Sequence, residues 1–192
     1  AFEVIEETFG VGQSGSYQGV HAETIISNGQ PSGYVWTDHS FESLVREDIE
    51  KIAAASGISD YNITTVPTPV KPEGFSRIED PDKDQTLDPK GISLVGNRTM
   101  SLDSNVLNGI VTIKDGRMTV PQDQDVCVIS EELALLNHLT VGDRIGFSPV
   151  KQEGPIQYAE IVGIYQVREP MTPYMSGDTY RSENIIFTNL DF

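Results

Sequence analysis

The sequence contains little of several residue types and patterns. Its single cysteine, Cys127, excludes an internal disulfide and a cysteine-rich zinc site. Uninterrupted apolar runs such as Val126–Ile129 are four residues long, whereas a membrane-spanning helix needs about 20. Basic residues are also few, because 13 Lys and Arg stand against 29 Asp and Glu, and the formal net charge is −16. A chain this acidic repels phosphate backbones and anionic lipid headgroups, which argues against nucleic-acid binding.

The 192 residues suffice for one ordinary domain or two small ones, and the first third predicts an α/β arrangement. Val45, Ile49, Ile52 and Ala53 have the spacing of one helical face, and Gly57 is a natural stop. The predicted elements are a helix tail over 1–9, a flexible connector over 10–19, a strand over 22–27, a helix over 46–58 and a strand over 60–66. This succession predicts a βαβ or split βαβ unit.

Residues 67–89 contain five prolines and an acidic centre, which predicts a long acidic loop or an inserted arm. Within it, we expect Glu79–Asp88 to be mobile or solvated and to bind no metal tightly. Beyond the arm, Ser130 followed by Glu131 and Glu132 predicts a helix over 130–137 with Leu133 and Leu136 buried. Short apolar segments predict strands over 91–95, 110–114, 126–129, 144–148, 158–167 and 183–190. The expected fold class is therefore α+β, with short helices against a mixed or antiparallel sheet.

Several short patterns resemble functional motifs, but each lacks a required part. Gly10–Gly15 matches G-x-G-x-x-G without a buried strand before it or a helix after it, so a connector explains it better than a dinucleotide site. Asp80–Asp88 resembles the start of a calcium loop, but Gln85 and Gly91 stand where Gly and Glu are required. Asn62 and Asn97 begin glycosylation sequons by pattern alone.

Catalytic and metal-binding patterns are equally weak. His21, His39 and His138 lack the spacing of metal ligands, and the sequence has no G-x-S-x-G elbow. We therefore expect no catalytic residue, no bound cofactor and no metal. A Ser-His-Asp triad stays open, because triads occur in several chain orders.

The most informative segment is Asp125–Ile145, where an apolar strand leads into Ser-x-x-Leu-Ala and then Leu-x-Val-Gly-Asp-x-Ile. This segment resembles the MacB-like periplasmic core domain, the ectodomain of ABC transporter permeases of the MacB/FtsX type. Ile161–Tyr165, Glu183–Thr188, Asp115–Arg117 and Arg46–Ile58 resemble further elements of that family. The residues that carry the fold motif are Ser130, Leu133, Ala134, Leu139, Val141, Gly142, Asp143 and Gly163. These are packing and turn residues, so the motif indicates a fold rather than a chemistry.

The resemblance implies an α+β domain with a membrane-proximal βαβ-type part and a β-rich distal part. On that basis we expect a helix tail and connector over 1–20, an α/β part over 21–70, the acidic arm over 71–90 and a β-rich part over 91–192. The family carries no catalytic residue in this domain. Its partners are the membrane-embedded part of the same permease, a second permease copy and a cytoplasmic ABC ATPase, and its substrates include peptides, lipoproteins and toxins.

The implied location is the extracytoplasmic side of a bacterial plasma membrane. We accordingly expect a transmembrane helix shortly before Ala1 and a second span beyond Phe192. Two other functions stay open. One is a free-standing secreted or surface-anchored binding module with a ligand in a cleft between two small subdomains, and the other is a small hydrolase. The full-length polypeptide distinguishes the permease domain from the binding module, and an activity screen tests for the hydrolase.

Overall fold

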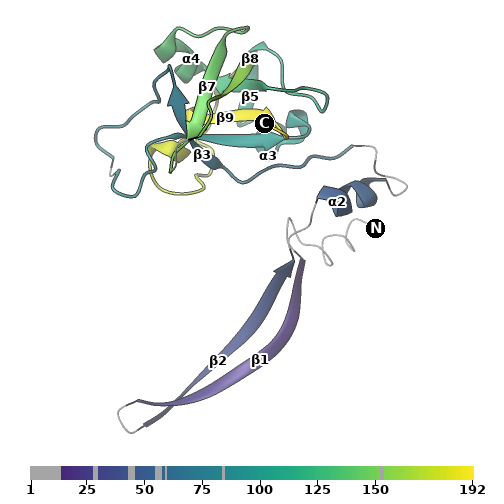
Figure 1. The fold of residues 1–192 in the computed structure, drawn as a ribbon, viewed down its shortest axis with the longest axis vertical. Coiled ribbons are helices and arrows are strands. Elements are labelled where there is room, and N and C mark those ends of the chain that lie inside the picture. Colours follow the sequence, from purple (N-terminus) through teal and green to yellow (C-terminus); the bar gives the residue numbers. More distant parts are fainter. Residues whose placement is uncertain are drawn as a thin grey trace. The chain divides into compact units, whose positions relative to one another are not determined.

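The computed structural model describes residues 14–27, 30–42, 46–54, 58, 60–83, 85–151 and 154–192, and the chain forms two compact units, Ala1–Asp60 and Tyr61–Phe192. In the first unit, strands β1 (Ser14–Ser27) and β2 (Gln30–Glu42) pair as an antiparallel hairpin, with an irregular register at Tyr17/Gly19 (Figure 1). Residues 14–19, expected in a flexible connector, therefore lie in a strand. Residues 1–13, including most of the G-x-G-x-x-G match, lie outside the described residues.

Helix α2 (Arg46–Ala53) follows the hairpin and agrees with the predicted helix, although it is shorter. Glu47 and Asp48 lie in its first turn, where carboxylates favour the helix dipole. Arg46 pairs with Glu50 at 3.0 Å and Lys51 with Asp48 at 3.5 Å. None of its eight residues is buried. Charged pairs on its surface therefore support α2, each by a few tenths of a kcal/mol.

The second unit is built around a closed six-stranded β-barrel with strand order β8-β6-β9-β4-β3-β7, which closes through β7–β8 pairing. Pairs β4–β9 and β6–β8 are parallel, and the others are antiparallel. The strands are β3 (Thr68–Glu73), β4 (Ile92–Asn97), β5 (Val111–Gly116), β6 (Val126–Ser130), β7 (Arg144–Pro149), β8 (Gln157–Val167) and β9 (Ile185–Asn189). Short helices α3 (Ser104–Leu107) and α4 (Glu131–Asn137) and 3-10 turns η1 (Met100–Leu102), η2 (Asp178–Tyr180) and η3 (Ser182–Asn184) join them.

The length of β8 explains how the barrel closes. Residues 157–160 of β8 pair with β7, whereas residues 163–167 pair with β5. One strand therefore both seals the barrel and carries β5 as an extra strand. Residues 160–165 of β8 also pair with β6 in parallel.

Two apolar clusters pack on the two faces of this sheet. The first has members or close neighbours in all six barrel strands, so it fills the barrel interior; it includes Ile92, Cys127, Ile129, Leu133, Ile145, Phe147, Ile161 and Ile186. The second, around Val128, Tyr165 and Phe187, covers the outer face. All five residues of β6 are buried, as a strand covered on both faces requires.

The α+β expectation is wrong, because this part of the chain is mostly β and its strands close into a barrel. The expected βαβ unit fails at residues 60–66, which contribute one isolated bridge, Thr64 to Asn97, and no strand. Asn62 and Thr64 direct their side chains to Asn97 at the end of β4, and Pro67 lacks the N–H that a longer ladder would use. The six strands predicted after residue 90 are all present, with ends shifted by up to two residues.

Candidate functional site

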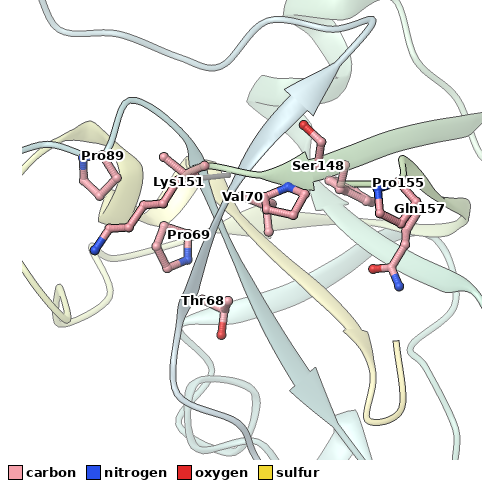
Figure 2. Close-up of a pocket in the computed structure, with 11 residues that line it drawn as sticks. Thr68, Pro69, Val70, Pro89, Ser148, Lys151, Pro155 and Gln157 are labelled. Carbon is pink, nitrogen blue, oxygen red and sulfur yellow. The ribbon is translucent and has the colours of Figure 1, made fainter. Parts of the chain in front are cut away.

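The candidate site is an apolar groove of about 490 Å³ at the place where β3 leaves β7 (Figure 2). Thr68 and Pro69 pair with β4, whereas β3 pairs with β7 only from Val70 onward. The start of β3 and the end of β7 therefore separate and leave a hollow. Its lining consists of Pro69, Pro89, Pro149, Pro155, Val70, Val150, Phe147, Thr68, Ser148, Gln157 and Lys151.

Prolines keep this hollow open. Pro69 lies on the edge of β3 that has no β7 partner, and a proline there cannot donate a hydrogen bond to a further strand. Gly91 packs so closely on β3 that an added Cβ would overlap the Val70 carbonyl oxygen. Beside the groove, the backbones of Val70 and Gly91 are therefore closely packed.

The polar groups lie at the ends of the groove. Figure 2 shows Lys151 near Pro69 and Pro89 at one end, and Pro155 and Gln157 at the other. The Ser148 hydroxyl donates to Glu73 at 2.6 Å, and the Thr68 hydroxyl donates to the Val66 carbonyl at 3.2 Å. Both hydroxyl protons are thus already used within the fold.

A second hollow shares Ser148, Pro149, Val150 and Lys151 with the groove and also contains Lys71 and Glu73. The Ser148 hydroxyl and the Lys71 ammonium, 3.1 Å away, stabilise the Glu73 carboxylate, so the pKa of Glu73 is lowered. Lys71 and Glu73 therefore neutralise each other beside the groove.

The acidic arm before the groove is held in place by a buried ion pair. Arg77 and Asp88 are almost fully buried and lie 2.5 Å apart. Burial opposes ionisation of Asp88, but hydrogen bonds from Thr179 and Arg77 outweigh it and lower the pKa of Asp88. The Thr179 hydroxyl accepts from the Gly91 amide at 3.0 Å, so this pair is tied directly to the start of β4.

Two further contacts anchor the same arm to the η2–η3 segment. The Asn184 side chain accepts from the Ile78 N–H at 2.9 Å and donates to the Ile78 carbonyl at 2.7 Å. The fully buried Asp178 accepts from the Asp80 amide at 2.7 Å and from the Gln85 side chain at 2.6 Å. Glu79–Asp88 was expected to be mobile or solvated, and for Asp80, Gln85 and Asp88 this is wrong, because Asp178 and Thr179 supply buried partners.

The family-like segment folds as strand, helix and turn. The Ser130 hydroxyl caps α4 by accepting from the Leu133 amide at 3.1 Å, and Leu133 and Ala134 are buried. Helix α4 begins at Glu131, so the helix predicted over 130–137 is confirmed with Ser130 as its cap. Leu136 is half exposed, so its predicted burial is wrong; the buried residues of α4 are Leu133 and Ala134.

The turn after α4 uses the remaining motif residues. His138 is left-handed and ends the helix, and Leu139 packs partly against the core. The Asp143 carboxylate accepts from the Thr140 amide and hydroxyl at 2.8 and 3.0 Å. Gly142 has φ +98° and donates to the Ile161 carbonyl. Val141 was expected to point to the core but is 38 % exposed.

Gly163, the last motif residue, lies in β8 directly beside the backbone of Arg117. An added Cβ would overlap the Arg117 carbonyl oxygen. All eight motif residues thus belong to one connected region of β6, α4, the following turn and β8, and none of them lines the groove.

The two sequons face each other. The Asn62 side chain donates to Asn97 Oδ1 at 2.6 Å and to the Thr64 hydroxyl at 2.9 Å, and it accepts from the Thr99 amide. Asn97 is 1 % exposed. These asparagines therefore hold the segment before β3 against the end of β4, and in the folded chain Asn97 is out of reach of a modifying enzyme.

Within the described residues, no three His, Cys, Asp or Glu side chains gather in a way that could hold a metal ion. None of the helices in that part of the chain has the length and apolarity needed to cross a bilayer. Cys127 is buried in the barrel interior, and burial raises the pKa of its thiol.

The groove was not anticipated from the sequence. Its lining comes from the start of β3, the end of the arm, and the end of β7 with the residues that lead into β8, three segments that only the barrel brings together. The signal present in the sequence was the density of prolines at Pro67, Pro69, Pro72 and Pro89, which suggested an arm rather than a lining. No protein-family model and no curated protein matches this chain.

Proposed function

We propose that this chain is an extracytoplasmic domain of an ABC transporter permease of the MacB/FtsX type. In this proposal the domain is non-catalytic and couples ATP-driven motion to the export or sensing of a peptide, lipoprotein or toxin. Its partners are the membrane part of the same permease, a second permease copy and a cytoplasmic ATPase.

The observation that carries the proposal is the structural role of the residues that resemble the family. Ser130 caps α4, Gly142 adopts a positive φ, and Gly163 permits close backbone packing. Residues of this kind are required by a particular backbone path, so a shared pattern among them supports a shared local fold. Function is then inferred by analogy with the family, not from a reactive site.

The alternative is a free-standing secreted or surface-anchored binding module, and the apolar groove is the observation that favours it. Small-molecule sites are typically hollows of this size lined by apolar groups with a few polar ones. A permease domain could carry such a groove as well. The two functions are therefore distinguished by whether the parent polypeptide has membrane spans on both sides of the domain.

Site-specific labelling of the parent protein in intact cells tests the proposal. Leu107 at the end of α3 is 65 % exposed, so Leu107→Cys offers an accessible thiol, whereas Cys127 stays buried and unreactive. A membrane-impermeant maleimide should label the cell-bound Leu107→Cys protein before lysis, above the background given by the unsubstituted parent.

Two results would contradict the permease function. Labelling that occurs only after lysis places the domain on the cytoplasmic side. Labelled protein released into the medium, from a gene product without spans on both sides of the domain, favours the secreted binding module instead.

A further inference from the structure

The groove between β3 and β7 differs in charge from the rest of the molecule. The chain carries 29 carboxylate residues, yet among the described residues that line this groove none is a carboxylate and only Lys151 is charged. The hollow beside α4 makes a useful contrast. It has a similar volume of about 540 Å³, but its Lys114 is paired with Glu131 and Asp115 lies beside them.

Lys151 also lacks a competing anion among the residues that the structure describes. No described carboxylate lies within ion-pair distance of its ammonium, whereas neighbouring Lys71 pairs with Glu73 at 3.1 Å. An unpaired cation at the end of an apolar hollow attracts an anionic group. The long-range field of a −16 protein would otherwise repel such a group.

The lining favours an apolar chain over an extended peptide. Peptides that bind beside a strand are held by backbone hydrogen bonds. Pro69, Pro149 and Pro155 have no N–H to donate, and the hydroxyl protons of Thr68 and Ser148 are already donated within the fold. What the groove offers is aliphatic surface from proline and valine, one cation at one end and the Gln157 amide at the other.

We propose that this groove binds an amphiphile with one carboxylate and an aliphatic chain, of the medium-chain fatty acid class. The chain lies along Pro69, Val70 and Pro149, and the carboxylate meets the Lys151 ammonium. The volume of about 490 Å³ is within the range of about 300–1,000 Å³ that small-molecule sites occupy. This inference does not depend on the permease proposal, because either kind of parent protein could use the groove.

Calorimetric titration of the 192-residue chain with decanoate, below its micelle concentration, tests the proposal. We expect saturable one-to-one binding that weakens with added salt. Lys151→Gln should weaken it about fivefold, the upper end for an exposed ion pair. Lys114→Gln, an equally simple change at the other hollow, should leave the affinity unchanged. Both lysines are exposed, so both variants should melt like the parent.

Amide resonances locate the ligand independently. Saturating decanoate should shift the signals of Val70, Val150 and Lys151 and leave those around α4 unchanged. The proposal fails if no saturable binding occurs, or if Lys114→Gln weakens binding as much as Lys151→Gln. It also fails if decanol binds as tightly as decanoate, or if a short peptide with an apolar C-terminal residue binds more tightly than decanoate.

Discussion

Replacement of Leu133 by alanine measures how tightly α4 is packed on the barrel. Leu133 is fully buried among Ile92, Ile129, Ile145 and Ile161. Burial of a leucine in a core is worth about 2–5 kcal/mol, and the loss is larger where the surroundings cannot collapse into the cavity. Because these neighbours sit on paired strands of a closed barrel, we expect Leu133→Ala to cost about 3–4 kcal/mol.

The same helix provides a matched control. Leu136 lies one turn further along α4 and is 50 % exposed. Leu136→Ala makes the same chemical change with the same gain in helix propensity, so the difference between the variants isolates burial. We expect Leu136→Ala to cost below about 1 kcal/mol.

Urea unfolding followed by far-UV circular dichroism is the suitable assay, because the only tryptophan, Trp36, lies in β2 of the other unit. The midpoint should fall for Leu133→Ala with an unchanged m-value. The corresponding drop in Tm is about 10 °C for a unit of this size. Equal losses of unfolding free energy for Leu133→Ala and Leu136→Ala would refute the inference that one face of α4 closes the barrel interior.

Three further predictions follow from buried groups. Asp88→Asn should cost about 3 kcal/mol at pH 7, because it leaves Arg77 buried without its nearest carboxylate. The folded pKa of Asp88 lies below the unfolded value of about 3.9, so its stabilisation is complete above about pH 4 and is lost as pH falls through the folded pKa; melting curves between pH 2 and 7 should show a smaller acid loss for Asp88→Asn. Burial raises the pKa of Cys127, so Ellman's reagent should react with the native chain far more slowly than with the urea-unfolded chain, and rapid native reaction would contradict its place in the core. Gly163→Ala should destabilise by about 1–3 kcal/mol, since its Cβ meets a backbone oxygen that cannot move aside; Gly109→Ala, where an added Cβ has open space but φ is +72°, is the comparison that measures strain alone.

The strands after residue 90 could be predicted because each carries its own signal. β6 is a short apolar run bounded by polar residues, and the start of α4 is marked by a serine cap and two acidic residues. These features depend on neighbours within a few residues. Local chemistry is therefore enough to place the elements.

Barrel closure could not be predicted in the same way. It depends on β8 being long enough to pair with β7 at one end and β5 at the other, and no local pattern reports that division. The prediction of a solvated acidic region was wrong for a related reason. Arg77 and Asp88 look like solvated charges in sequence, but Thr179 bonds both of them from about a hundred positions further along the chain. The groove likewise exists only because three separate segments meet.

The two proposals rest on different parts of the second unit, and this makes them separable. The resemblance to permease ectodomains is carried mainly by the end of β6, α4, the turn after α4 and Gly163 of β8, where residues fix the path of the backbone. The groove is lined by the start of β3, the end of the arm, and the end of β7 with the residues that lead into β8, and it contains no motif residue. A family pattern preserves backbone geometry, whereas ligand binding depends on side chains that such a pattern leaves free to vary. Failure of decanoate binding would therefore leave the permease proposal intact. Release of the labelled parent into the medium would contradict the permease proposal and leave the proposal of a ligand at the groove and Lys151 intact.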